Sequence, residues 1–264
     1  MEISEVCEKF GVEWSISDVV ENKYVINAIC QFRSSTCSSI KDIAELLESS
    51  KSNQIRFSAG AAQDIIAYLF FKGKNDGFYI DIGAYDGFNG STTYWAEQIG
   101  WKGICVEPHK ATFEQMQKFR KNSTLYNCAL SNKSQSNAEF IVFPNIATRN
   151  GLANSLGETR IEDANKYSCM EKSFCSTKTF GDIMNDFPDI NYVDFISIDT
   201  EGHEMQVLES IDFDKFSFGL MTVETQDGSD VVKFVESKGY KKFIVSYSDV
   251  IFYNPAFFST LVRM

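Results

Sequence analysis

Short apolar segments alternate with helical patterns from about residue 60 onwards, and this alternation constrains the fold more than any other feature of the chain. The apolar segments are rich in Ile, Val, Phe and Tyr, and the strands they predict are residues 77–82, 103–107, 125–130, 193–199 and 219–224. The predicted helices are residues 91–99, 110–121, 179–187, 204–210 and 229–238. Such alternation is typical of a mainly parallel sheet with helices on both faces, as in Rossmann-like α/β proteins.

Three other segments complete this prediction for the second half of the chain. Residues 241–247 and 249–254 are both apolar and strand-like, and they predict a hairpin-type pair that gives the sheet an antiparallel end. Residues 144–176 are long, polar and poorly periodic. Because a structureless connection of that length is unusual inside a domain, we expect it to be a lid or a binding loop over the acceptor.

The N-terminal part of the chain has a different character. Residues 37–50 place apolar side chains on one helical face, and Ser38 or Ser39 is available as the helix N-cap. This part contains no motif to which a chemistry can be assigned. We therefore divide the chain into a small helical N-terminal extension, residues 1–57, and a main domain, residues 58–264.

Composition and charge exclude several classes of protein. The formal net charge is −11 with no basic cluster, which weighs against nucleic acid as a partner. No apolar run approaches the length of a membrane span, so no membrane insertion is expected. The seven cysteines include no Cys-x-x-Cys pair, and Cys105 and Cys128 lie in strand-like segments where reduced core thiols are expected. We expect a soluble, cytoplasmic protein of a reducing compartment; the sequence does not indicate its oligomeric state.

The first predicted strand ends in an acid and opens directly into a glycine turn. Asp81 is followed by Gly83 and Gly87, and Glu107 ends the next strand, 26 residues after Asp81. Glycines allow the backbone to turn tightly and to approach a ligand closely. An acid at the end of the second strand is suited to accepting hydrogen bonds from both ribose hydroxyls of an adenosine. The pattern therefore predicts a nucleoside-binding turn.

The charge around this turn indicates which nucleoside it binds. A dinucleotide-binding turn presents a third glycine and helix N–H groups to a pyrophosphate, whereas here an acid precedes the turn and the third glycine is missing. An acid repels phosphate but favours an ammonium or a sulfonium. S-adenosylmethionine has an adenosine, no phosphate and two positively charged groups, so it fits this turn better than NAD.

Residues 58–254 resemble the FkbM-type methyltransferase family. The motifs that carry the resemblance are Gln63-Asp64, Asp-Ile-Gly-Ala-x-x-Gly at 81–87, Ser91 and Thr93, Gly-Trp-x-Gly followed by Glu-Pro at 100–108, YNCALS at 126–131, IDTEGHE at 198–204, and TVE at 222–224. Ala62 stands where the family usually has a glycine before the glutamine. Residues 1–57 have no counterpart in the resemblance.

The resemblance implies a class I methyltransferase sheet with S-adenosylmethionine as cofactor. It also implies transfer of the methyl group to an oxygen, often a sugar hydroxyl, so the expected partner is a glycan or a glycosylated small molecule. The residues that the strand ends and the resemblance together assign to the cofactor are Gln63, Asp64, Asp81, Gly83, Ala84, Tyr85, Gly87, Ser91, Thr92, Glu107, Pro108, Asn127, Cys128, Ala129 and Asp199.

The end of the fourth predicted strand, DTEGHE at 199–204, is the expected site of the chemistry. An alcohol needs its proton removed as it attacks, and a histidine has a pKa close to working pH. We therefore expect His203 to accept the proton and Asp199 to orient the acceptor. Glu201 is a further catalytic candidate, equally compatible with a turn role, and Glu204 is expected to be a helix-start acid.

Glu224 ends the fifth strand beside this segment and completes the catalytic candidates. Together with Asp199 it could bind a divalent ion that orients acceptor hydroxyls, but the spacing leaves the metal undecided. Two other functions compete with an O-methyltransferase: an NAD-dependent oxidoreductase on a related sheet, and a binding protein that keeps the fold without the activity. The intact acids and glycines weigh against the second alternative.

Overall fold

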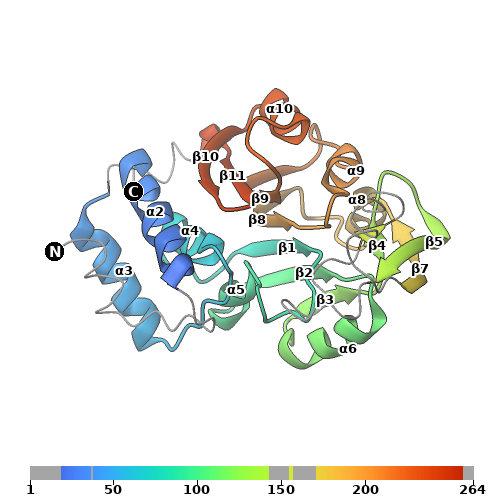
Figure 1. Cartoon of the computed structure of the whole chain (residues 1–264), viewed down its shortest axis with the longest axis horizontal. Coiled ribbons are helices and arrows are strands. Elements are labelled where there is room, and N and C mark those ends of the chain that lie inside the picture. The colour runs from blue at the N-terminus through green and yellow to red at the C-terminus, as the bar shows by residue number, and fades with distance from the viewer. Residues whose placement is uncertain (1–18, 37, 143–154, 157–170, 258–264) are drawn as a thin grey trace.

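The computed structural model of the chain describes residues 19–36, 38–142, 155–156 and 171–257 (Figure 1). Its centre is a seven-stranded sheet with the order β10-β11-β9-β8-β1-β2-β3. The strands of this sheet are β1 (Phe78–Ile82), β2 (Lys102–Val106), β3 (Ser123–Tyr126), β8 (Tyr192–Ile198), β9 (Ser217–Glu224), β10 (Lys241–Ser246) and β11 (Asp249–Tyr253).

The sheet is mainly parallel with an antiparallel end, as the sequence predicts. Strand β1 pairs in parallel with β2 and β8, β2 with β3, and β8 with β9, whereas β11 runs antiparallel to both β9 and β10. After β1 the chain adds β2 and then β3 on one side of β1, and it later adds β8 and then β9 on the other side. The strand order therefore reverses beside β1, which is where parallel sheets bind ligands.

Helices cover both faces of this sheet, and each face has its own hydrophobic cluster (Figure 1). One cluster joins alternate residues of the strands, such as Tyr79 and Phe195, to α2 (Val19–Thr36), α3 (Ile40–Ser52), α4 (Gln63–Phe70) and α5 (Tyr94–Gln98). The other joins the opposite alternation, such as Ile80 and Ile196, to α8 (Phe180–Met184), α9 (Glu204–Glu209) and α10 (Asp230–Ser237). Two-sided burial explains why these strands are continuously apolar.

The N-terminal helices are built into the first of these clusters. Ile29 of α2 and Leu47 of α3 are buried in it, so these helices share a core with the sheet. Ser39 is the N-cap of α3, and its side chain forms a capping box with Asp42, which confirms the predicted helix start. The boundary placed after residue 57 stays a prediction. Helix α4 has no amphipathic pattern because all eight of its residues are buried, so sequence analysis assigned no helix to it.

A second, four-stranded sheet with the order β4-β7-β5-β6 was not predicted. Its strands are β4 (Ala129–Leu130), β5 (Gln135–Val142), β6 (Ser155–Leu156) and β7 (Glu171–Lys178). The single strand predicted over 125–130 is wrong, because its residues divide between β3 of the main sheet and β4 of this one. The structureless connection predicted over 144–176 is wrong for residues 171–176, which belong to β7; apart from Ser155–Leu156, its remainder lies outside the described residues.

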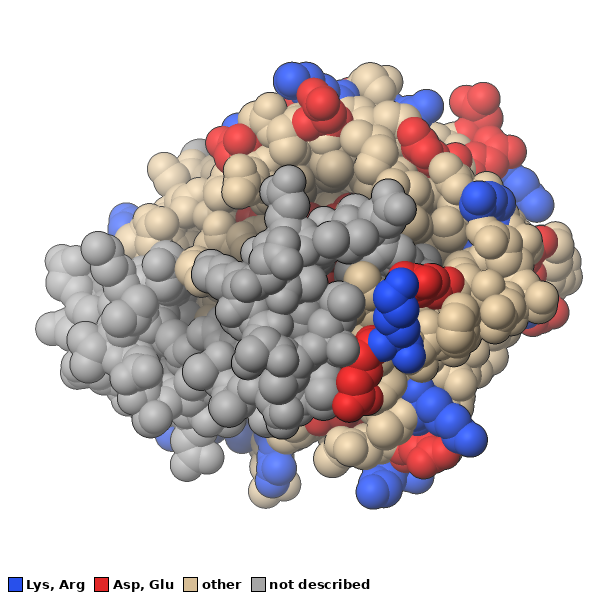
Figure 2. Space-filling model, turned by 45° about the vertical axis from the view of Figure 1, so that its right-hand side comes forward, with Lys and Arg blue, Asp and Glu red and all other residues tan. Residues whose placement is uncertain are grey.

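Helix α6 (Lys110–Phe119) completes the described helices and follows β2. None of the helices in the described part of the chain is both long and apolar enough to cross a membrane. On the face shown in Figure 2, acidic and basic side chains are intermixed over the surface.

A steric test of this architecture uses two glycines with similar backbone conformations. Gly83 has φ +84°, and a Cβ built on it would lie 1.7 Å from the carbonyl oxygen of Asp199; Gly90 has φ +72° with nothing within 4 Å of its Cβ position. We expect Gly90→Ala to lower the free energy of unfolding by only about 1 kcal/mol, from backbone strain. Gly83→Ala should lower it by roughly 3 kcal/mol or more, because the backbones after β1 and β8 must separate. Chemical denaturation measures both values, and equal losses would contradict the close approach.

Candidate active site

The glycine turn that follows β1 is fixed by hydrogen bonds to the end of β2. The N–H groups of Gly83 and Ala84 both donate to the carbonyl of Val106, at 2.9 and 3.0 Å, and Gly87 N donates to the carbonyl of Ala84 at 2.9 Å. Gly83, Tyr85 and Gly87 all have positive φ. For Tyr85 this conformation is uncommon, and uncommon backbone conformations concentrate at functional sites.

Glu107 follows β2 and is tied to the same turn. Its carboxylate accepts hydrogen bonds from Tyr85 N at 2.9 Å, from His109 N at 2.7 Å and from the Thr112 hydroxyl at 2.9 Å. Burial raises the pKa of Glu107 to about 7, against the lowering effect of these bonds. The carboxylate therefore holds the turn directly over the end of β2.

The acceptor capacity of Glu107 decides whether it also fits an adenosine. A carboxylate has about four lone-pair positions, and the three bonds place two donors on Oε1 and one on Oε2. Oε2 therefore retains one position for a ribose hydroxyl. The site fits S-adenosylmethionine in this respect. For Glu107 to bind both ribose hydroxyls at once, the two hydroxyls would have to share that position on Oε2, or one of the three existing bonds would have to be given up. The ribose-binding role stays a prediction.

Asp81, expected to face the positive groups of the cofactor, is 4% exposed and lies on the same face of β1 as Tyr79, the face that α5 covers. Its Oδ2 accepts a hydrogen bond from the Thr93 hydroxyl at 2.5 Å and lies 3.3 Å from Nη2 of Arg120. Burial raises the pKa of Asp81, and the Arg120 guanidinium opposes that shift. Sequence analysis did not identify Arg120, which follows an ordinary polar helix.

The upstream pair Gln63 and Asp64 begins α4 and orders the chain around it. Asp64 Oδ2 accepts bonds from the backbone N–H groups of Ser58 and Ala59, at 2.6 and 2.9 Å, and burial raises its pKa to about 7. Gln63 Nε2 donates to Asp249 at 2.6 Å. Ala62, which replaces the family's usual glycine, adopts a left-handed φ of +64°. Any direct contact of this pair with the cofactor stays a prediction.

Ser91 and Thr92 lie between the glycine turn and α5. Ser91 Oγ accepts the backbone N–H groups of Thr93 and Tyr94, at 3.2 and 3.1 Å, and so begins the helix. The Thr92 hydroxyl donates to Ser197 of β8 at 2.7 Å. These contacts connect the segment after the turn to the neighbouring strand, whereas a role in binding the cofactor stays a prediction.

The residues expected around the adenine lie beyond β2 and β3. Asn127 Nδ2 donates to the carbonyls of Glu107 and Pro108, at 2.9 and 3.1 Å, while Cys128 and Ala129 are buried. Pro108 and Asn127 border a cleft of about 650 Å³ whose other walls come from α6, β5 and β7. The cleft is large enough for a ligand, so the predicted adenine position is open to one.

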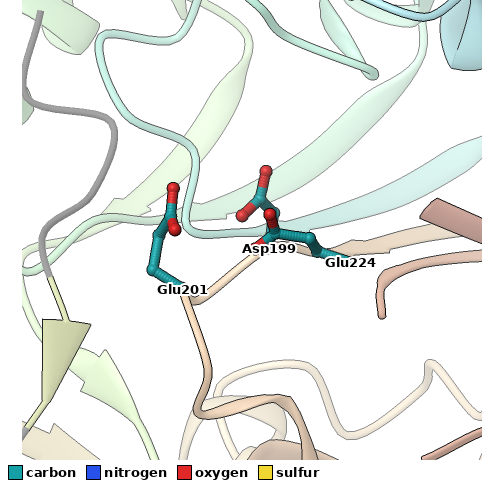
Figure 3. A group of neighbouring side chains, drawn as sticks. All are labelled: Asp199, Glu201 and Glu224. Carbon is teal, nitrogen blue, oxygen red and sulfur yellow. The ribbon is translucent and has the colours of Figure 1, made fainter. Parts of the chain in front are cut away.

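Three carboxylates gather at the ends of β8 and β9 (Figure 3). Oxygens of Asp199, Glu201 and Glu224 lie within 4.8 Å of one another. The negative charges of Glu224 and Glu201 raise the pKa of Asp199 above its usual range; because the Asp199 side chain is itself exposed to solvent, we attribute the shift to these charges rather than to burial. The crowding of these negative charges favours a proton on one of the carboxyl groups. The predicted catalytic acids are therefore brought together.

Asp249 is a fourth carboxyl at this edge, and sequence analysis missed it. It begins β11 and pairs with Glu224 of β9, so its side chain lies on the same face of the sheet. Burial raises its pKa to about 7, and the charge of Glu224 contributes while the Gln63 bond opposes the shift. The only sequence signal was an acid at the start of an apolar strand, which usually marks a turn.

The two remaining titratable residues of the 199–204 segment, His203 and Glu204, have structural partners. Glu204 Oε1 accepts hydrogen bonds from Thr200 N and Gly202 N, both at 2.9 Å, and this confirms Glu204 as a helix-start acid. His203 precedes α9, and its Nε2 lies 3.0 Å from the hydroxyl of Ser131. Burial lowers the pKa of His203. One ring nitrogen is thus committed to Ser131, which directly follows β4, and the role of His203 as base stays a prediction.

Comparison with protein families assigns the chain. Residues 81–242, more than half of the chain, match the methyltransferase FkbM domain. The chain therefore belongs to the FkbM methyltransferase family, and its sheet is that of the class I, S-adenosylmethionine-dependent methyltransferases. Because this is a family of methyltransferases, the prediction of an NAD-dependent oxidoreductase is dropped. Comparison with curated proteins gives no match.

Solved structures show only distant likenesses to this chain. A methyltransferase FkbM from Methylobacillus flagellatus is 12% identical, with 87% of this chain and 59% of that chain covered and a TM-score of 0.45, so this chain spans about three fifths of its length. A TehB-like SAM-dependent methyltransferase from Corynebacterium glutamicum is 10% identical (81% and 97% covered, TM-score 0.38). Aeropyrum pernix fibrillarin with bound S-adenosyl-L-methionine is 13% identical (68% and 66% covered, TM-score 0.34). These likenesses carry no conclusion about the acceptor.

The raised pKa values predict how stability depends on pH. Asp64, Glu107 and Asp249 have pKa values of about 7 in the folded protein, against 3.8 for Asp and 4.5 for Glu, so the folded state keeps protons that the unfolded chain releases. Stability should therefore fall as pH rises from about 4 to about 7 and level off above that. Asp249→Asn should flatten that fall and add on the order of 1 to 3 kcal/mol at pH 8. Denaturation at several pH values measures this; an unchanged slope in the variant would contradict the raised pKa.

Proposed function

We propose that the protein transfers the methyl group of S-adenosylmethionine to a hydroxyl oxygen of a glycan or a glycosylated small molecule. The observation that carries the proposal is the pair of carboxyl groups, Asp199 and Glu224, beside the glycine turn. The sugar acceptor rests on the family resemblance. S-adenosylmethionine, when bound, supplies an electrophilic methyl group on a positively charged sulfur.

The cofactor side of the proposal is supported by the turn after β1. Tyr85 N and Glu107 hold the turn and the end of β2 together, and Glu107 retains one acceptor position. Asn127 and Pro108 border the cleft on the adenine side. These residues would bind and orient the nucleoside. Gly83 is packed against the backbone of Asp199, so the cofactor turn directly adjoins the carboxyl pair.

The carboxyl pair supports a role in moving the acceptor's proton. A hydroxyl that attacks a methyl carbon must lose its proton, and a base is most effective when its pKa lies near working pH. The acidic neighbours of Asp199 raise its pKa above the usual value, which makes it a stronger base than an ordinary aspartate. His203 already shares Nε2 with Ser131. We therefore propose the Asp199–Glu224 pair, rather than His203, as the proton acceptor.

A divalent cation is a second way to relieve the crowding of charge at this edge. Asp199, Glu201 and Glu224 offer the carboxylate oxygens that Mg²⁺ or Ca²⁺ prefers, so the donor set fits such an ion. There it would orient neighbouring acceptor hydroxyls and lower their pKa. Transfer that persists in EDTA favours a proton on the carboxyl pair, whereas transfer restored only by added Mg²⁺ favours the cation.

The acceptor is tested with isotopically methyl-labelled S-adenosylmethionine and a panel read by mass spectrometry. The panel contains free sugars, glycosides, a catechol as a hydroxyl without sugar, and an amino sugar as a nitrogen acceptor. We expect O-methylated glycosides with the wild type and no product with Asp199→Asn. Labelling confined to the catechol or to nitrogen would overturn the sugar hydroxyl. Binding of S-adenosylmethionine without transfer to any acceptor would favour an inactive binding protein.

Glu107→Ala should weaken S-adenosylmethionine binding. Loss of a charged hydrogen bond to the ribose and of the bond to Tyr85 N should raise the dissociation constant roughly 10- to 100-fold. Calorimetric titration measures the change. The matched control is Glu209→Ala, which removes an exposed acid that bonds only Asn132 among its described contacts, and it should bind as the wild type does. Unchanged affinity in Glu107→Ala would remove the ribose assignment.

Kinetics of two variants distinguish the rival bases. Asp199→Asn should lower the maximal rate on the order of 10²- to 10⁴-fold, because the proton acceptor is lost. His203→Ala should keep most of the rate and its dependence on pH, since Nε2 is occupied by Ser131. A loss of the acid limb of the pH–rate profile in His203→Ala, with Asp199→Asn still active, would instead make the histidine the base.

A further inference from the structure

A fully buried arginine lies directly beneath the glycine turn, and nothing in the proposed chemistry uses it. The Arg120 side chain is 0% exposed, although the residue follows α6 in a polar stretch of sequence. Removing a guanidinium from water is expensive unless its donors are matched. A cation held at such a position needs an explanation beyond general stability, because buried ion pairs are weak evidence for stability.

Every nitrogen of the guanidinium has a partner, and together the partners surround the turn. Nε donates to the carbonyl of Gly87 at 2.7 Å, and Nη1 donates to the Tyr79 hydroxyl at 2.9 Å. Nη2 donates to Ser91 at 2.6 Å and to Thr93 at 2.8 Å. The same Nη2 lies 3.3 Å from Asp81, and Nη1 lies 3.9 Å from Glu97. Arg120 therefore connects β1, the end of the turn and the start of α5.

The contact with Gly87 is both polar and steric. A Cβ on Gly87 would lie 2.9 Å from Cγ of Arg120 and 2.8 Å from Cγ of Met116, so the turn rests directly on these side chains. Gly87 N closes the turn on Ala84, while Glu107 holds the middle of the turn through Tyr85. The turn is thus fixed at one end by β2 and at the other by Arg120.

Glu97 fixes the chain segment that carries Arg120. Its carboxylate accepts the N–H groups of Lys121 and Asn122, at 2.5 and 2.8 Å, immediately after Arg120. It also accepts the hydroxyls of Tyr79 and Ser123, at 2.9 and 2.6 Å. Arg120 is consequently held both by its contacts with the turn and by the bonds of Glu97 to the two residues that follow it. A shift of Arg120 would therefore move the turn.

We propose that Arg120 is the positioning residue of the cofactor turn, and that Asp81 serves as its counter-charge rather than as a contact of the cofactor's positive groups. This inference rests on the proposed function, since it assigns the turn to S-adenosylmethionine. Arginine suits the role because its planar fork of five donors fixes several acceptors at once, whereas a lysine would supply the charge without the geometry. Misplacement of a binding turn by about 1 Å is enough to weaken function roughly 100-fold.

The experiment compares Arg120→Lys with Asp194→Asn as a matched control. Asp194 is a buried acid that forms a partly exposed ion pair, 2.9 Å from Lys74, and accepts Phe78 N at the opposite end of β1. Calorimetry measures S-adenosylmethionine affinity, and hydrogen exchange of the cofactor-free protein measures the opening of residues 84–89. Denaturation measures the stability of each variant.

We expect Arg120→Lys to raise the dissociation constant roughly 10- to 100-fold and to speed exchange at residues 84–89. Asp194→Asn should lose comparable stability without either effect. If the lysine variant fails to fold, Thr93→Val removes one partner of the guanidinium and should shift both readouts in the same direction.

Two results would overturn the positioning role: unchanged exchange and affinity in the Arg120 variant, or equal changes in the Asp194 control. A wild type that does not bind S-adenosylmethionine would overturn the proposed function instead. The exchange comparison, which needs no ligand, would in that case still decide whether Arg120 holds the turn.

Discussion

The close approach of the backbones after β1 and β8 is the constraint on which the site depends. Asp199 N donates to the carbonyl of Ile82 at 3.0 Å, and the Cβ position of Gly83 lies within 1.7 Å of the Asp199 carbonyl. Only a residue without a side chain can occupy that position. The glycine turn after β1 and the strand end that presents Asp199 are therefore one packed unit, and each is placed by the other.

Much of this unit could be predicted from sequence because parallel strands place their ends at one edge of a sheet. Asp81, Glu107, Asp199 and Glu224 each end an apolar run, so their grouping follows from the fold class alone. Asp249 escaped the same argument, because it begins an antiparallel strand and reaches the edge from the opposite direction. A search for acids at the carboxyl ends of parallel strands does not find an acid at the start of an antiparallel strand, although both lie at the same edge of the sheet.

Other features were missed because their sequences lack a periodic signal. Strands β5 and β7 pair mainly with each other and expose much of their surface, so they read as polar stretches rather than as apolar runs. Arg120 lies in a charged segment typical of a solvated helix end, and only the three-dimensional contacts show that it is buried. Burial of a charge depends on partners distant in sequence, which no local pattern reveals.

The two acids that flank the close approach show how environment divides their roles. Burial raises the pKa of Asp81, whereas the pKa of the exposed Asp199 is raised by the neighbouring carboxyl groups. At Asp81 the shift is opposed by Arg120 and Thr93, so the carboxylate is held in a fixed, compensated contact. At Asp199 the neighbouring carboxyls raise the pKa, which favours the protonated form of the group. Asp81 is thereby suited to holding structure, and Asp199 to the proton transfer that we propose.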